Sequence, residues 1–117
     1  VPVVVSATAD GLGWAVSGGG ANGCGNAIHN VDPDREVKVM AAQGLQECKK
    51  MLMLAKAGKL NGYLLEGMAC PGGCVAGAGT LQNPVKSTAA LNKYKASAPE
   101  KYSVDSKYEI TLNLLHD

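Results

Sequence analysis

The 117-residue sequence contains no phenylalanine, and aromatic residues make up only 4% of it. Because the apolar fraction is an ordinary 46%, we expect a core of aliphatic side chains, methionine and alanine. The sequence also lacks a run of about 18 apolar residues that could cross a bilayer, and it lacks a charged segment followed by an apolar run, the pattern of secretion. These absences predict no membrane partner and a cytoplasmic location.

Neither sign of charge is in clear excess. The sequence has 11 Lys and Arg and 10 Asp and Glu, which gives a net charge of +1. Nucleic-acid binding needs a clustered basic surface, and no such cluster stands out, so we expect no nucleic-acid partner. The length suits one small domain. The chain begins with Val1 rather than Met, and we expect residues 1–117 to be a single domain cut from a longer protein.

Four cysteines occur in a chain without an export signal, where metal ligands or free thiols are more common than disulfides. Residues 70–74 (Cys-Pro-Gly-Gly-Cys) place two soft thiolates, Cys70 and Cys74, on a loop with almost no side-chain bulk. Glycines let such a backbone approach a large inorganic group. Iron and sulfur are therefore the first candidates for what the pair binds.

The other two cysteines have less distinctive surroundings. Cys48 is expected to be a buried free thiol on a helix, while the role of Cys24, which stands among glycines, is left open. A self-contained site made of all four cysteines is an alternative, although their spacing matches no zinc-ribbon or ferredoxin pattern. His29 and His116 fit no ligand spacing and are expected at the surface.

Hydrophobic periodicity predicts an α/β fold built on a βαβ unit, with a small, mostly parallel sheet flanked by helices. Its parts are a strand at 37–42, an amphipathic helix at 45–57 and a buried strand at 63–65. The helix should bury Leu45, Cys48, Leu52 and Ala55. The second strand leads into a cysteine loop at 66–80, at the carboxyl end where such sheets carry functional loops. Flanking segments are expected as follows: an edge strand or loose terminus at 1–7, a glycine-rich loop at 8–17, and helices at 18–29 and 84–96. After 105 the pattern suits either a helix or a strand, and a helix is preferred.

A rival motif occurs in residues 18–23, which satisfy the dinucleotide-binding pattern G-x-G-x-x-G. That pattern needs a strand before it and an acidic residue about 20 positions later, and neither is clear in this sequence. The simpler interpretation of these glycines is close packing of a helix.

Residues 66–79 resemble the third cysteine motif of the iron-only (FeFe) hydrogenases, which has an acidic residue, any residue, Met-Ala-Cys-Pro-Gly-Gly-Cys, two variable residues and glycines. Residues 14–20 (Trp-Ala-Val-Ser-Gly-Gly-Gly) resemble that family's aromatic, Gly, small, Thr or Ser, Gly, Gly segment. Residues 36–45 resemble the strand and turn before its next helix. The three landmarks keep the family's order, and the resemblance spans about residues 9–96.

Two departures from the family pattern affect the interpretation. Residues 77–81 are Gly-Ala-Gly-Thr-Leu, where catalytic members have a triple glycine and then Gln-Pro. Members altered in this way are proposed sensory or regulatory hydrogenases. The family's two earlier cysteine motifs are absent. The resemblance therefore implies the C-terminal lobe of a two-lobed catalytic domain, whose partners are the N-terminal part of that domain and a ferredoxin-type electron carrier.

The resemblance also implies a cofactor, the H-cluster, in which a 4Fe-4S cubane is joined through a cysteine sulfur to a diiron unit. By motif position, Cys70 would ligate the cubane and Cys74 would supply the bridging sulfur. The cofactor-binding residues implied are Trp14, Ala15, Ser17, Glu66 and Met68. The simpler alternatives are a core-filling Met68 and an exposed Glu66 at a strand end.

Two functions follow from these patterns. The first is a hydrogenase lobe that helps to interconvert hydrogen with protons and electrons, or to sense hydrogen. The second is a binding module that holds a plain iron-sulfur cluster for redox sensing or electron transfer. With two of four ligands, the 117-residue chain alone is expected to be inactive and free of the H-cluster.

Overall fold

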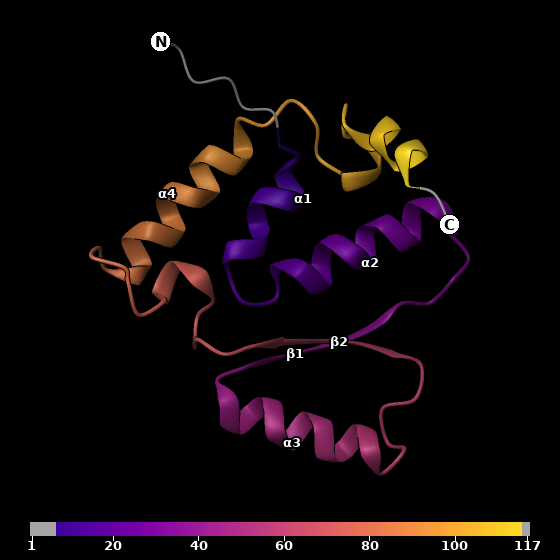
Figure 1. Cartoon of the computed structure of the whole chain (residues 1–117), viewed down its shortest axis with the longest axis vertical. Coiled ribbons are helices and arrows are strands. Elements are labelled where there is room, and N and C mark those ends of the chain that lie inside the picture. The colour runs from indigo at the N-terminus through magenta and orange to yellow at the C-terminus, as the bar shows by residue number, and fades with distance from the viewer. Residues whose placement is uncertain (1–6, 116–117) are drawn as a thin grey trace.

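The computed structural model describes residues 7–115 and has a parallel two-stranded sheet at its centre (Figure 1). Strand β1 (Lys38–Gln43) pairs with β2 (Tyr63–Met68), in a register that sets Lys38 opposite Tyr63 and Gln43 opposite Met68. Helix α2 (Gly19–Val31) lies on one face of the sheet and α3 (Leu45–Lys56) on the other. The α/β class and the βαβ unit flanked by helices are confirmed.

Helix α3 has nearly the predicted bounds but a narrower buried face. Met51 is 5% exposed and packs toward the sheet together with Cys48 and Ala55, whereas Leu45 and Leu52 are 74% and 61% exposed. The prediction that both leucines are buried is wrong, because two strands are too narrow to cover a stripe of that width.

Strand β2 is longer and more exposed than the sequence predicted. It runs on through Glu66 to Met68, so the first three residues of the segment 66–80 are sheet. Tyr63 is 40% exposed, because β1 is the only strand paired with β2 among the described residues. Leu64 and Leu65 are only half-buried, so the prediction of a buried strand at 63–65 is wrong.

The segment before α2 is not the loop that was predicted. Helix α1 (Ala9–Leu12) and a 3-10 turn (Gly13–Ala15) occupy it. The Thr8 hydroxyl accepts a hydrogen bond from the Gly11 amide at 3.1 Å, which caps the short helix. A side-chain cap and packing against α2 hold a helix that glycine content alone disfavours.

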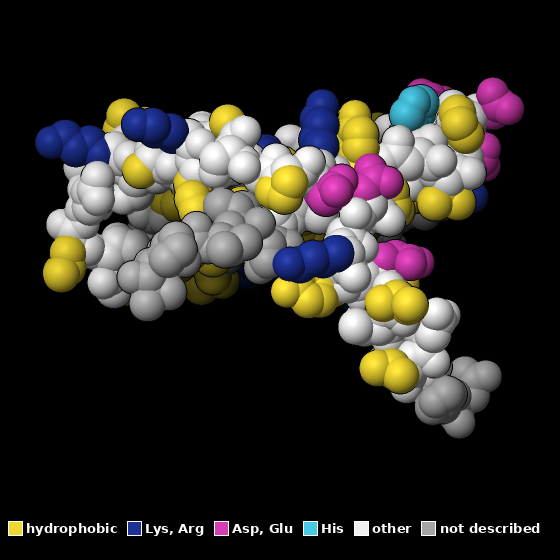
Figure 2. Space-filling view, turned by 90° about the horizontal axis from the view of Figure 1, so that it is seen from above, with side chains coloured by type: hydrophobic (Ala, Val, Ile, Leu, Met, Phe, Trp, Pro, Cys, Tyr) yellow, Lys and Arg dark blue, Asp and Glu magenta, His cyan; other side chains and the backbone are white. Residues whose placement is uncertain are grey.

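The cysteine loop contains a 3-10 turn (Cys74–Ala76). Helix α4 (Pro84–Ala96) follows the loop, as predicted from its N-terminal proline. The C-terminal part forms two 3-10 segments, Ser103–Asp105 and Glu109–Leu114, in place of the predicted α-helix. Figure 2 shows this part projecting from the rest with hydrophobic side chains at its surface. His29 is exposed, while His116 and the predicted segment 1–7, apart from Ala7, lie outside the described residues.

Candidate functional site

The cysteine loop leaves the carboxyl end of β2 and closes immediately into a tight turn. The amide of Gly73 donates a hydrogen bond to the carbonyl of Cys70 at 2.9 Å. Gly72 and Gly73 have φ angles of +90° and +89°, a left-handed region that residues with a Cβ rarely adopt. The two cysteines therefore stand on either side of a turn that requires glycine, with Cys70 half-buried, Cys74 exposed and both thiols free.

The turn packs against the backbone of residues 15–17, which belong to the first of the other two landmarks, residues 14–20. The amide of Ser17 donates to the carbonyl of Gly72 at 3.1 Å. A Cβ on Gly73 would lie 2.7 Å from the Ala15 carbonyl oxygen and 2.6 Å from the Ser17 nitrogen. Ala15 and Ser17 thus meet the cysteine loop through their backbones, at a distance that only glycine at position 73 permits.

The exit of β1, within the third landmark, contacts the other flank of the loop. The side-chain oxygen of Gln43 accepts a hydrogen bond from the Gly72 amide at 2.6 Å, and the Gly44 amide donates to the Met68 carbonyl at 2.8 Å. Gln43 was not among the predicted site residues. Its position at the end of a strand, directly before a glycine, is the sequence feature that could have marked it as a site residue.

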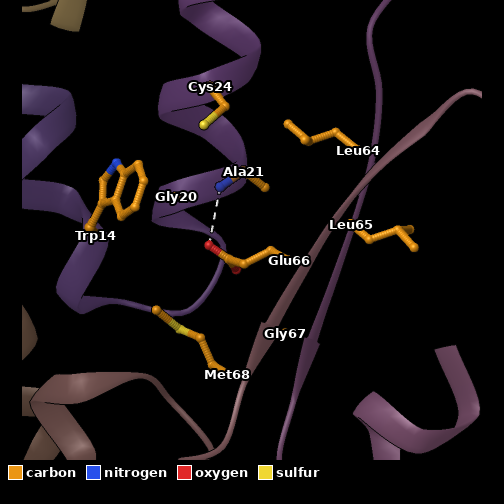
Figure 3. Close-up of a pocket in the computed structure, with 9 residues that line it drawn as sticks. All are labelled: Trp14, Gly20, Ala21, Cys24, Leu64, Leu65, Glu66, Gly67 and Met68. Carbon is orange, nitrogen blue, oxygen red and sulfur yellow. Dashed lines mark hydrogen bonds between the residues drawn. The ribbon is translucent and has the colours of Figure 1, made fainter. Parts of the chain in front are cut away.

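Glu66 points from β2 to the start of α2 (Figure 3). One carboxylate oxygen accepts from the Gly18 amide at 2.7 Å and the other from the Ala21 amide at 3.1 Å. A dinucleotide would place its pyrophosphate at this helix terminus, where the Glu66 carboxylate would repel it. The arrangement favours the packing interpretation of the glycines over nucleotide binding.

A cavity of about 330 Å³ lies between α2 and β2, next to this contact (Figure 3). Trp14, Glu66 and Met68, three of the predicted site residues, line it together with Leu64 and Cys24. The cavity wall combines an aromatic ring, a thioether, a thiol and a carboxylate. Ala15 and Ser17 contact the cysteine loop instead, so the structure divides the predicted residues between a cavity and the adjoining turn.

The four cysteines do not gather into one site. The Cys48 thiol lies between α3 and the sheet, 3.7 Å from the Ala42 carbonyl oxygen and 3.6 Å from that of Met68. Cys24 is on α2, which covers the opposite face. No group of three His, Cys, Asp or Glu side chains within residues 7–115 is arranged to hold a metal ion. Cys70 and Cys74 are thus two donors without further ligands beside them in the described structure.

This donor set fits part of an iron-sulfur cluster site. Thiolates are the usual protein ligands of such clusters, and a glycine turn leaves no Cβ between its backbone and a bulky group. A complete site needs ligands from elsewhere.

Among residues 7–115, no helix has the length and apolar character needed to span a membrane.

Comparison with known proteins gives one family match. Residues 15–78, just over half of the chain, match the family described as iron only hydrogenase large subunit, C-terminal domain. The matched range contains all three landmarks except their outermost residues, Trp14 and Gly79, which directly flank it. A search of curated proteins found no match.

Proposed function

The chain belongs to the family formed by the C-terminal domain of the iron-only hydrogenase large subunit, and from this premise we propose that it is the lobe that supplies Cys70 and Cys74 to the H-cluster. The observation that carries the proposal is the way the cysteine turn packs against its neighbours. Its backbone packs against residues 15–17 and donates a hydrogen bond to Gln43, while both thiols stay free. When bound, the cluster supplies the electron and proton chemistry of hydrogen conversion.

The surrounding residues then have distinct parts. Met68 offers a polarizable thioether near the loop. Trp14 lines the adjoining cavity with its ring, which is 52% exposed. Ala15 and Ser17 hold the turn through backbone contacts. Glu66 joins β2 to α2 and does not contact the cluster in this proposal, because backbone amides occupy both of its oxygens.

The remaining ligands come, in this proposal, from the N-terminal part of the same catalytic domain. The amount of exposed surface supports such a partner. The chain exposes 8419 Å², roughly 2,400 Å² more than a compact protein of its length, which exposes about 6,000 Å². Only Ala21, Ala42 and Met51 are buried hydrophobic residues in the described part, and both edges of the parallel sheet are open. An excess of this size matches a permanent interface.

The family also leads us to propose a ferredoxin-type protein as the electron partner. Whether the lobe serves turnover or sensing depends on the altered residues 77–81. Ala78 stands where catalytic members have the middle glycine of three, and Thr80 stands where they have glutamine. This departure favours the sensory type as the second candidate. A plain iron-sulfur module for redox sensing or electron transfer is the remaining alternative.

We expect the 117-residue chain to be inactive by itself and its parent protein, the longer polypeptide with the other cysteine motifs, to evolve hydrogen. The cluster needs four thiolates. With only the two from this chain, it would stay open to water and oxidation. After reconstitution with iron and sulfide, or maturation of the parent, hydrogen evolution from reduced viologen is measured. Robust turnover by the chain alone contradicts the proposal. Iron binding by the parent with turnover at background supports the sensory type.

A further inference from the structure

Helix α2 begins without a capping side chain of its own. Its N-cap is Gly18, at a φ of +87°, and Gly19 and Gly20 follow. The first amides of a helix have no intrahelical partner and usually bond to the side chain at the N-cap. Here Glu66, 48 residues from Gly18 in sequence, accepts from two of these amides. Its negative charge also suits the positive end of the helix dipole.

The glycines of α2 make this contact possible. A Cβ on Gly20 would lie 2.7 Å from the Glu66 Oε1 atom, and a Cβ on Gly23 would lie 3.1 Å from the Trp14 indole nitrogen. The helix is therefore bare on the face that receives the carboxylate and the indole ring. Glycine lowers helix propensity relative to alanine, so the bare face weakens the helix while it makes room for these two side chains.

Glu66 and the cysteine turn attach to the same short stretch of chain. Glu66 bonds to Gly18 and Ala21, and Gly72 bonds to Ser17. Cys70 lies between these two attachment points in sequence. With both in place, the backbone that carries Cys70 is fixed on each side relative to residues 14–21. Without Glu66, the remaining hydrogen bond to this stretch is the one between Gly72 and Ser17, which follows Cys70 in sequence.

We propose that Glu66 is a positioning residue that sets the place of Cys70 relative to residues 14–21, an inference that rests on the proposed function. Its two bonds join strand β2, which leads into the cysteine turn, to the helix that follows the other loop of the site. The role is exerted through the backbone, and Glu66 itself needs no contact with iron.

The test uses the parent protein with Glu66→Ala, Glu66→Gln and the control Ser106→Ala. Ser106 also accepts a backbone hydrogen bond, from the Tyr108 amide at 3.2 Å, but it lies between the two C-terminal 3-10 segments. In metal-free protein, Glu66→Ala should speed amide exchange at Gly18 and Ala21 roughly three- to thirtyfold, the range for a lost helix cap. It should also speed alkylation of Cys70 relative to Cys74 by about threefold or more, because the strand loses an attachment.

In iron-loaded protein, Glu66→Ala should change the electron paramagnetic resonance spectrum of the cluster. Glu66→Gln retains one oxygen acceptor and should give intermediate values, and it decides the matter if Glu66→Ala does not fold. Ser106→Ala should change none of these readouts.

Three results overturn the proposal. Faster exchange in Glu66→Ala with an unchanged Cys70 rate and spectrum shows a helix cap without a positioning role. Unchanged exchange shows that the contact is unimportant. Equal effects from Ser106→Ala show general destabilisation. Failure of the proposed function is distinct from all three, because iron would then leave Cys70 unprotected in the wild-type parent while the metal-free results stand.

Discussion

Replacement of Cys70 or Cys74 by alanine is expected to reduce the iron bound by the parent protein to less than about a tenth of the wild-type amount. Each substitution removes a thiolate from a site in which this lobe supplies only two. The described residues contain no third donor grouped with them that could substitute. Iron per polypeptide and the cluster absorption in the visible range measure the loss.

Cys48→Ala is the matched control for this prediction. It also removes a half-buried thiol, but one that lies between α3 and the sheet, close to the Ala42 and Met68 carbonyls. We expect its iron content to equal that of the wild type. Full iron content in both the Cys70 and Cys74 variants, or a loss as large in Cys48→Ala, contradicts the ligand assignment.

Gly73→Ala is expected to reduce iron loading nearly as far while leaving both cysteines in place. The new Cβ would lie within 2.7 Å of backbone atoms of Ala15 and Ser17, which cannot turn aside as a side chain can. The φ of +89° adds a strain of roughly 1–2 kcal/mol for a residue with a Cβ. The turn must therefore shift, and Cys74, the next residue, shifts with it.

Gly79→Ala is the control, because no atom lies within 4 Å of its expected Cβ and its φ is not in the left-handed region. We expect this variant to load iron normally and to unfold in denaturant at the wild-type midpoint. Gly73→Ala should fall at least about fivefold below it in iron content. Equal loading by the two variants would show that the packing of the turn does not position the ligand.

Much of the fold could be predicted because it depends on local patterns. Alternation over β1 and apolar periodicity over α3 specify a strand and a helix without knowledge of the neighbours. What failed depends on tertiary context. The exposure of Leu52 follows from a sheet of only two strands, and helix α1 forms through the Thr8 cap and its packing on α2. Neither cause is visible in a periodicity of 3.6 or 2.

The site divides in the same way. Cys70 and Cys74 could be proposed from five consecutive residues, because their chemistry lies in their spacing and in the glycines between them. The contacts of Glu66 with α2 and of Gln43 with Gly72 join residues 29 to 48 positions apart. Such contacts depend on the register of β1 on β2 and on the placement of α2, which no local pattern specifies.

Cysteine footprinting in the parent protein tests the central claim most directly. Metal-free and iron-loaded samples are treated with an alkylating reagent, and mass spectrometry gives the rate of modification at each cysteine. We predict that Cys74, which is exposed, and then Cys70 react faster than Cys48 in the metal-free protein, and that iron protects both of them while the rates at Cys24 and Cys48 hold. Cys70 and Cys74 reacting at their metal-free rates in the iron-loaded protein would contradict the account.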